Sequence, residues 1–329
     1  MKKNTIKKIC TLLPCIMFVL KSNIYASEVK KPIRILISQS ASHPALDTTT
    51  KGVIDAIKDA GYVEGENLDL RIESAQANSA LAAQIASKFV QMNADVVVAI
   101  ATVSAQSLAK AANEGKVKVA FSTVTDPLGA HIVNTLDVPG NNTSGISNFV
   151  DLAPQVMLFQ RIQPTLKKLG IIYNPGEVNG VKIIKELEKV CESLNLILIK
   201  QTVTRTGDVP QAAAKLAATV DAIFISNDNT ALSGFQSIIK AARDAQKPVY
   251  VSDTDEVSQG AIAALGPNQY EVGKQTGRMV IRAINGEDLG MIPVEFPANT
   301  ELHLNLDAAR KAGIDIPQEI INSATKIIN

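Results

Sequence analysis

The chain has 329 residues, of which 33 are basic and 32 acidic, and its formal charge is +1. A chain of this length can bury a large core and usually forms one large domain or two smaller ones. A charge so close to balance argues against nucleic acid and anionic lipid as partners, because both select strongly basic surfaces.

The first 26 residues are predicted to form a secretory signal peptide. Four lysines precede an apolar stretch from Ile9 to Leu20, and a short polar segment ends at Ala26. This stretch is shorter than the roughly 20 residues that a membrane-spanning helix needs. Cys15 follows Pro14, where a lipidation signal would have a small residue. We therefore expect cleavage near Ala26 and release into the periplasm without a lipid anchor.

The leader contains five lysines and no acidic residue, so its removal would leave 303 residues with a formal charge of −4. A mildly acidic surface is again not that of a protein that binds nucleic acid. Cys191 would be the one cysteine left, so no internal disulfide could form. We expect a monomer without a cofactor.

From Pro32 onward, short β-branched runs alternate with longer helical patterns, which predicts an α/β fold. In the first half of the chain we expect helices at 46–60, 78–93 and 104–113, and strands at 33–37, 67–73, 95–100 and 117–122. Strands and helices that alternate at this spacing form right-handed crossovers. They predict a parallel sheet covered on both faces.

The same pattern then begins again. Helices are expected at 178–194, 211–218 and 231–245, and strands at 169–173, 196–203, 221–226 and 248–252. Two successive series of alternating strands and helices, similar in size, predict two similar lobes.

The last part of the chain is too short for a third domain. It contains an expected strand at 261–265, a helix at 270–285, a strand at 292–296 and a short terminal helix. We expect these elements to complete both sheets, so the chain must cross between the lobes more than once. We place a hinge of three crossings near 145–150, 253–260 and 286–292.

These crossings define the expected domains. The first lobe would contain residues 27–147 and 258–287, and the second lobe residues 148–257 and 288–329.

Polar residues follow nearly every expected strand. Parallel α/β sheets bind ligands at the carboxyl ends of their strands, so these residues predict a site for a small polar ligand. Each of these clusters also has the composition of a helix cap, and capping alone remains an alternative for each of them. The candidates are Ser38, Gln39, His43, Thr102, Ser104, Thr123, Asp126, Tyr173, Asp228, Asn229 and Asp253.

The charges of these candidates favour a zwitterion such as an amino acid. The turn at 102–106 starts a predicted helix, whose N–H groups can hold a carboxylate, with Ser104 as a ligand, a cap or both. The acidic clusters at Asp228 and Asp253 suit an ammonium group. Tyr173 and Phe149, if they face the cleft, favour an apolar or aromatic ligand side chain.

Patterns typical of enzymes and metal sites are absent from the sequence. No cysteine or second histidine lies near His43 at a metal-ligating spacing, and neither a nucleophile-elbow motif nor a phosphate-binding loop occurs. We expect neither catalysis nor a metal. A secreted enzyme, which would use His43 and Asp126, is the weakest of the alternatives.

Five segments of the chain resemble a known family. They read Gly-Tyr-Val-Glu-Gly-Glu-Asn-Leu at 61–68, Val-Thr-Asp-Pro-Leu-Gly-Ala at 124–130, Ile-Tyr-Asn-Pro-Gly-Glu at 172–177, Asn-Gln-Tyr-Glu-Val-Gly-Lys-Gln at 268–275, and Leu-Asn-Leu at 304–306 with 309–314. Together they look like the ABC transporter substrate-binding family that includes tryptophan- and tyrosine-binding lipoproteins. The resemblance covers nearly the whole chain after the leader.

This resemblance implies a type I periplasmic-binding-protein fold, with two Rossmann-like lobes that close on a solute. It also implies delivery of the solute to an ABC permease with a separate ATPase. Residues carried over by matching segments imply a cleft lined by Ser38, Gln39, His43, Thr102, Ser104, Thr123, Asp126, Tyr173, Asn229 and Asp253. The chain departs from the family in two places. It lacks a lipobox, and residues 226–229 read Ser-Asn-Asp-Asn, where a proline would be expected ahead of the Asp-Asn pair.

Two functions follow from this reading. The chain is expected to be a periplasmic solute-binding protein of an ABC importer, with an aromatic or apolar amino acid as its ligand. The alternative is a ligand-sensing module for a membrane receptor or kinase, which would use the same closing cleft.

Overall fold

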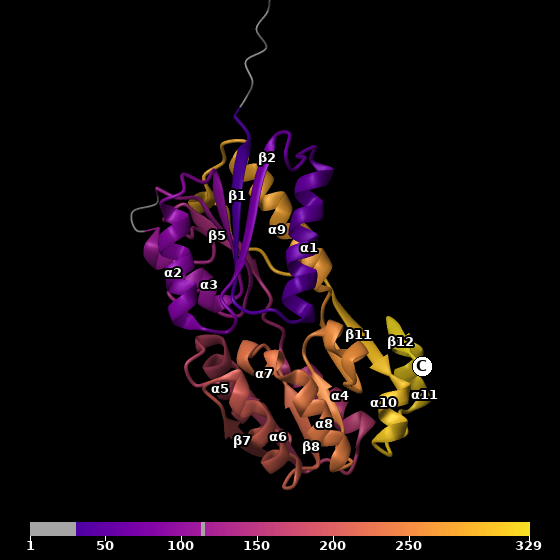
Figure 1. Cartoon of the computed structure of the whole chain (residues 1–329). Coiled ribbons are helices and arrows are strands. Elements are labelled where there is room, and N and C mark those ends of the chain that lie inside the picture. The colour runs from indigo at the N-terminus through magenta and orange to yellow at the C-terminus, as the bar shows by residue number, and fades with distance from the viewer. Residues whose placement is uncertain (1–30, 113–115) are drawn as a thin grey trace, which may run out of the picture. The chain divides into compact units, whose positions relative to one another are not determined.

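The computed structural model describes residues 31–112 and 116–329, and from Pro32 onward the chain forms a single unit. The predicted signal peptide lies outside the described residues. Two β-sheets with helices on both faces build two lobes, which confirms the expected α/β class (Figure 1). No helix in the described part is both long and apolar enough to span a membrane.

The first lobe is built on a five-stranded parallel sheet with the order β2-β1-β3-β4-β5. Helices α1 (Pro44–Asp59) and α9 (Gln269–Ile284) cover one face, and α2 (Ser79–Val90) and α3 (Thr102–Ala111) cover the other. The strands are β1 (Ile33–Gln39), β2 (Leu68–Ser74), β3 (Val96–Ile100), β4 (Val119–Val124) and β5 (Thr143–Ser147). Almost every residue of β3 to β5 is buried, as expected for parallel strands covered on both faces.

The second lobe is built on a seven-stranded sheet with the order β12-β11-β10-β9-β8-β6-β7, in which only the β10–β11 pair is antiparallel. The strands are β6 (Lys168–Tyr173), β7 (Ile197–Thr202), β8 (Ala222–Ile225), β9 (Val249–Val251), β10 (Ala263–Pro267), β11 (Thr300–Asn305) and β12 (Lys326–Ile328).

One face of this sheet packs against α4 (Leu152–Ile162), α5 (Val178–Ser193), α10 (Leu306–Lys311) and α11 (Gln318–Ser323). The other face packs against α6 (Val209–Ala217), α7 (Asn229–Ser233) and α8 (Phe235–Asp244). Gly234 divides the helix expected at 231–245 into α7 and α8. Three 3-10 turns complete the chain, namely η1 (Thr206–Asp208), η2 (Thr254–Gln259) and η3 (Leu289–Met291).

The structure places two chain crossings later than the sequence predicts. Strand β10 pairs with β9 and β11, so residues 258–267 belong to the second lobe, and the chain crosses at Asn268 before α9. Residues 288–296 belong to the first lobe, because the Ser147 N–H donates to the Glu295 carbonyl and Ser144 Oγ donates to the Ile292 carbonyl. Short strands carry no sequence signal for the sheet that they join, which explains both errors.

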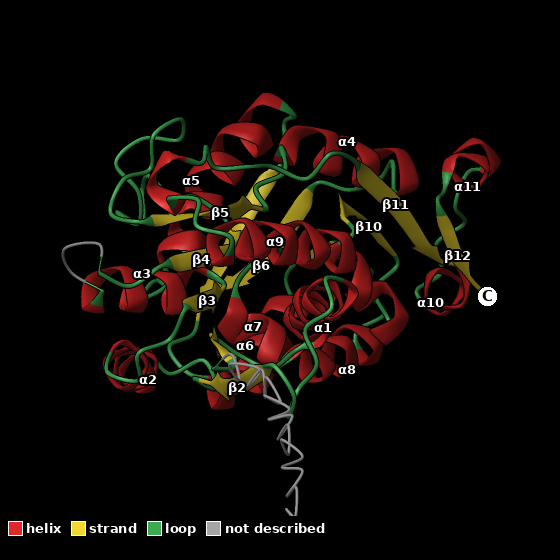
Figure 2. Ribbon diagram, turned by 90° about the horizontal axis from the view of Figure 1, so that it is seen from above, coloured by secondary structure: helices red, strands yellow, loops and turns green. Residues whose placement is uncertain are grey.

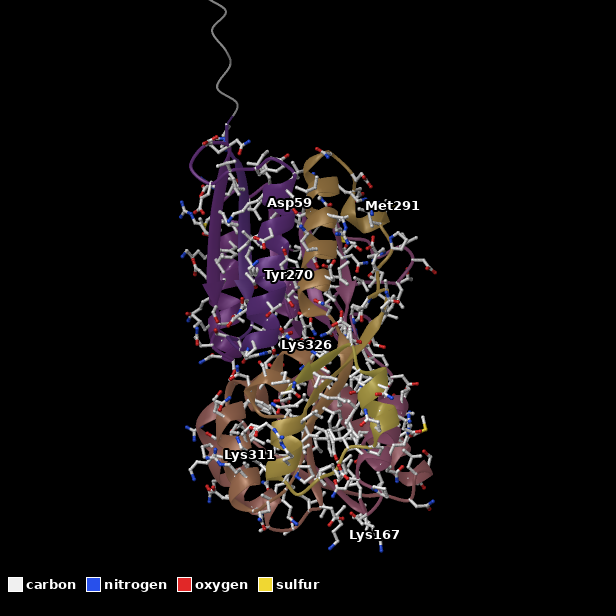
Figure 3. The ribbon with its side chains drawn as sticks, turned by 90° about the vertical axis from the view of Figure 1, so that its right-hand side faces the viewer. Asp59, Lys167, Tyr270, Met291, Lys311 and Lys326 are labelled. Carbon is white, nitrogen blue, oxygen red and sulfur yellow. The ribbon has the colours of Figure 1, made fainter. Side chains whose placement is uncertain are left out.

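Helices α1 and α9 lie side by side with their backbones in contact (Figure 2). A Cβ atom at Gly273 would lie 2.1 Å from the carbonyl oxygen of Thr49, and one at Gly52 would lie 2.2 Å from that of Tyr270. Figure 3 labels Tyr270 and Asp59 along this helix pair. The two helices therefore form a rigid pair, and both begin at the same cleft, α1 after His43 and α9 with Gln269.

Candidate ligand-binding site

A small cavity, with a volume of about 10 Å³, lies at the carboxyl ends of strands from both sheets. The first lobe contributes seven residues at or after the ends of β1, β3 and β4 and also Gln269 at the start of α9. The second lobe contributes residues after β6, β8 and β9. The lining residues are His43, Ala45, Leu46, Ala101, Thr102, Thr123, Thr125, Asn148, Asn179, Asn227, Asn229, Leu232, Asp253 and Gln269. The cavity thus lies at the edge where α/β sheets usually hold ligands.

The structure brings five of the predicted site residues to the wall of this cavity. They are His43, Thr102, Thr123, Asn229 and Asp253. The other six predicted residues, Ser38, Gln39, Ser104, Asp126, Tyr173 and Asp228, do not line it.

Ser38, Gln39 and Ser104 lie behind the cavity wall. Their hydrogen bonds connect β1, α1 and α3, from which residues of the wall project. Ser38 Oγ donates to Ser104 Oγ at 3.1 Å, which ties β1 to α3. Gln39 Nε2 donates to Asp47 Oδ1 at 2.6 Å, and Gln39 Oε1 accepts from Thr50 Oγ1 at 2.7 Å. These contacts fix the first turn of α1, directly after His43.

Asp126, Tyr173 and Asp228 also have structural partners. Asp126 Oδ1 accepts from the Gly129 N–H and closes a turn, and Tyr173 packs against the core of the second lobe. Asp228 caps α7 by accepting from the Ala231 N–H. Burial, and then the charge of Glu177, raise the pKa of Asp228 well above its ordinary range. The capping alternative therefore describes Asp228 better than a role in ammonium binding.

The N-terminus of α3 opens into the cavity at Thr102. Ala101, which precedes it, has a φ of 68°, an uncommon conformation for a residue with a Cβ atom. The N–H of Ser104 is already engaged by Ser40 Oγ at 2.9 Å. The N–H groups of Thr102 and Val103 precede the first intrahelical hydrogen bond. These two N–H groups, unlike that of Ser104, have no intrahelical or side-chain partner, and of the two residues Thr102 lines the cavity.

Asp253 is the carboxylate of the cavity wall. It is buried, and Oδ1 accepts a hydrogen bond from Gln269 Nε2 at 2.6 Å. Burial and the neighbouring charge of Glu256 raise the pKa of Asp253 to about 7, although His43 acts in the opposite direction. A cationic group in the cavity would lower this pKa and stabilise the carboxylate.

His43 connects the first lobe to the second. Its Nε2 lies 3.3 Å from Asn229 Oδ1, and its Nδ1 lies 3.5 Å from Glu256 Oε1. Burial lowers the pKa of His43, but the close contact with Glu256 and the charge of Glu256 outweigh burial, and the pKa is raised. Thr48 Oγ1 adds a second contact between the lobes, to Asp255 Oδ1 at 3.1 Å. The lobes are therefore closed on each other around the cavity.

Glu177 was not predicted, although it supports the cavity wall from behind. It is buried and accepts hydrogen bonds from the backbone and side chains of Asn229 and Thr230 and from the side chain of Asn179. Thr125 and Asn227 also escaped prediction, although both follow strands in the polar clusters that the sequence indicates. Nothing in the sequence distinguishes Glu177 from an exposed residue at a helix start.

The described residues contain no group of three or more acidic, histidine or cysteine side chains that could hold a metal ion. The chemistry of the cavity is that of hydrogen bonds, the Asp253 carboxylate, the His43 imidazole and a few apolar side chains.

Comparisons with known proteins agree with this geometry. The sequence profile of the family described as ABC transporter substrate binding protein matches residues 34–328. A tyrosine-binding protein of Clostridioides difficile is 32% identical over 284 residues, which cover 86% of this chain and 82% of that protein.

Solved structures are similar over most of the chain. A conserved domain protein from Vibrio cholerae has a TM-score of 0.88 and 37% identity, with 90% of this chain and 100% of that chain covered. An ABC domain from Streptococcus pneumoniae in complex with L-Trp has a TM-score of 0.86 and 29% identity, with 91% and 100% covered. A ligand-free, open substrate binding protein from Clostridium difficile has a TM-score of 0.65 and 30% identity, with 90% and 99% covered.

The last two structures have nearly equal identity to this chain but very different TM-scores. This difference agrees with the contacts of His43 and Thr48, which show a closed arrangement of the lobes. The expected type I periplasmic-binding-protein fold with two lobes is confirmed.

Proposed function

Because the chain belongs to the ABC transporter substrate binding protein family, a family of solute-binding proteins and not of enzymes, we propose that it captures an amino acid in the interlobe cavity. In this proposal the protein is exported, its signal peptide is cleaved near Ala26, and it acts in the periplasm as a monomer. It delivers the amino acid to an ABC permease that is driven by a separate ATPase.

The observation that carries the proposal is the placement of opposite polarities in the two walls of the cavity. Asp253 is the one carboxylate among the described lining residues, which include no lysine or arginine. The first lobe contributes the N-terminus of α3 at Thr102. A zwitterion would satisfy both, with its ammonium on Asp253 and its carboxylate on the N–H groups of Thr102 and Val103.

The side chain of the ligand would contact the apolar part of the wall. Ala45, Leu46 and Leu232 line the cavity, whereas Tyr173 and Phe149 pack against the core of the second lobe. The aromatic preference therefore rests on the relatives, which include a tyrosine-binding protein and a domain in complex with L-Trp. L-tyrosine and L-tryptophan are the first ligands to test.

Closure follows from the same contacts. A ligand that binds Thr102 on the first lobe and Asp253 on the second would favour the arrangement in which both lobes reach it. The closed form would then be the one that the permease recognises.

Isothermal titration calorimetry of refolded, ligand-stripped protein tests the proposal. L-tyrosine or L-tryptophan should bind, and analogues that lack one charge, tryptamine and N-acetyl-L-tryptophan, should bind at least about tenfold more weakly. No heat from any standard amino acid would contradict the proposal. Binding of myo-inositol or another sugar alcohol would instead show that the ligand is not an amino acid.

A further inference from the structure

We propose that Glu177 is a positioning residue which, through Asn229, fixes the protonation of His43 when the lobes close, so that ligand capture takes up a proton. The inference rests on the proposed function, because the proton is counted on ligand binding.

The first step is the hydrogen bonding of Glu177. Oε2 accepts from the Asn229 N–H at 3.1 Å, from Asn229 Nδ2 at 2.7 Å and from Asn179 Nδ2 at 3.0 Å. Oε1 accepts from the Thr230 N–H at 2.9 Å and from Thr230 Oγ1 at 2.7 Å. Every partner is a donor, which is the environment of an ionised carboxylate.

The second step is the orientation of the Asn229 amide. An ionised carboxylate only accepts hydrogen bonds, so the Nδ2 group must face Glu177 and Oδ1 must face away from it. Oδ1 lies 3.3 Å from Nε2 of His43. Because Oδ1 can only accept, Nε2 of His43 must carry a proton.

The third step concerns the other nitrogen of the ring. Nδ1 lies 3.5 Å from Oε1 of Glu256, a fully buried residue whose side-chain oxygens accept no hydrogen bond in the described structure. A neutral ring with its proton on Nε2 would turn a lone pair toward a buried carboxylate. A second proton, held between Nδ1 and Glu256, removes this repulsion and gives both groups a partner.

The charges around His43 favour the same state. Glu256 and Asp253 both raise the pKa of His43, from η2 and from the turn after β9. Asp255, also on η2, has a pKa raised to about 6 by burial and then by Glu256, and it accepts from Thr48. In the described part of the chain, His43 is the only ion-pair partner of Glu256. The cluster is therefore rich in acid and gains from one positive charge.

The linkage to ligand binding comes from the lobes. His43 belongs to the first lobe and Glu256 to the second, so opening separates them and exposes the ring to water, where its pKa returns to about 6.5. At about pH 7.5 the open form would carry a proton on about one ring in ten. The closed form would carry more protons, because the pKa of His43 is raised there, so capture should take up protons, at most one per ligand. Asp253 would change this number little, because a pKa of about 7 already leaves it mostly ionised at about pH 7.5 and a ligand ammonium would keep it ionised.

The sign of the pH dependence follows directly. Affinity should fall as pH rises from the His43 pKa of the open form to that of the closed form, and should level off outside this interval.

Calorimetry with L-tryptophan and L-tyrosine in phosphate and in Tris at about pH 7.5 measures the proton, because the two buffers differ in their heat of ionisation. The wild type should take up a measurable fraction of a proton per ligand. Glu256→Gln and Glu177→Gln should each reduce this number to less than half, since the first removes the negative partner and the second frees the Asn229 amide. The matched control is Glu192→Gln, an exposed carboxylate on α5 that should keep the wild-type number.

Binding with equal heats in both buffers would overturn the inference and leave the proposed function standing. A Glu177→Gln protein that is less stable but takes up the same number of protons would reduce Glu177 to a structural role and also overturn it.

If no amino acid binds, the proposed function fails. Nitrogen-15 NMR of the imidazole then measures the pKa of His43 and tests its contact with Glu256 independently of the ligand. Signals of His131 and His303 are assigned with the variants His131→Gln and His303→Gln. A His43 pKa above the ordinary value that falls in Glu256→Gln supports the inference. A raised pKa that does not fall in this variant overturns it.

Discussion

Gln269 and Asp253 join the two lobes at the cavity wall, where Nε2 of Gln269 donates a 2.6 Å hydrogen bond to Oδ1 of Asp253. Gln269 begins α9, which packs on the first sheet, whereas Asp253 follows β9 in the second. Oδ1 is therefore held by the first lobe.

Replacement of Asp253 tests its proposed role as the partner of the ligand ammonium. Asp253→Asn keeps an acceptor for Gln269 but removes the charge that a ligand ammonium would meet, so the Kd for L-tryptophan or L-tyrosine should rise at least about tenfold. Calorimetry gives the value. The matched control is Asp244→Asn, an exposed aspartate that pairs with Lys240 and should leave the affinity unchanged. Equal affinities of wild type and Asp253→Asn would remove Asp253 from the site.

The raised pKa of Asp253 also predicts a pH dependence of stability. Its folded-state pKa is about 7 and its unfolded value about 3.8, so between these values the folded protein binds more protons. The free energy of unfolding of the ligand-free protein should therefore fall as pH rises from about 4 to 7. Each pKa unit corresponds to about 1.4 kcal/mol, so this contribution amounts to a few kcal/mol.

Other groups titrate in the same range, so the difference between wild type and Asp253→Asn is the quantity to measure. Urea unfolding from about pH 4 to 7 should show the variant gaining stability relative to the wild type as pH rises. Parallel curves for the two proteins would show that Asp253 is not buried in the ligand-free state in solution.

The sequence predicts the two-lobed fold and five of the fourteen residues of the cavity wall for one physical reason. Parallel strands place their carboxyl ends at a common edge, so His43, Thr102 and Asp253 could be located from strand ends alone. Ser104 and Asp228 follow strands too, but they serve β1 and α7, since hydroxyls and carboxylates cap helices as readily as they bind ligands.

Other features depend on contacts that local patterns do not encode. Glu177 acts on Asn229, which lies 52 residues later in the chain. Strand β10 reads Ala-Ala-Leu-Gly-Pro, a run that would suit either sheet, and its partner β11 was not predicted. Both features become visible only when the two lobes are assembled.

The close contact of α1 and α9 predicts a strong effect of a single methyl group. Gly273→Ala would place a Cβ atom 2.1 Å from the Thr49 carbonyl oxygen, so the helices must separate. We expect a loss of about 1–3 kcal/mol in the free energy of unfolding, as for other overpacked sites. The control is Gly207→Ala, where a Cβ atom has no neighbour within 4 Å. Urea unfolding that shows equal losses for both variants would contradict the close packing.

Cys191 offers a test of the core that is independent of the ligand. It is buried on α5 against the core of the second lobe, and burial raises the pKa of its thiol to about 11. At about pH 8 only about one thiol in a thousand would be ionised, and the thiolate is the reactive form. In the unfolded protein about one thiol in ten would be ionised, so the folded protein should react with a disulfide reagent at least about a hundredfold more slowly than protein unfolded in about 6 M urea.

A matched variant separates burial from any general effect of the fold on thiol reactivity. Ser193→Cys in a Cys191→Ala background places the thiol on the same helix at an exposed position, and it should react nearly as fast when folded as when unfolded. Addition of a ligand that binds the closed form should slow the labelling of Cys191 further, in proportion to the stability gained on binding. Rapid labelling of folded wild-type protein would show that α5 does not pack as the structure places it, and the support that Glu177 gives to Asn229 from the start of this helix would fail with it.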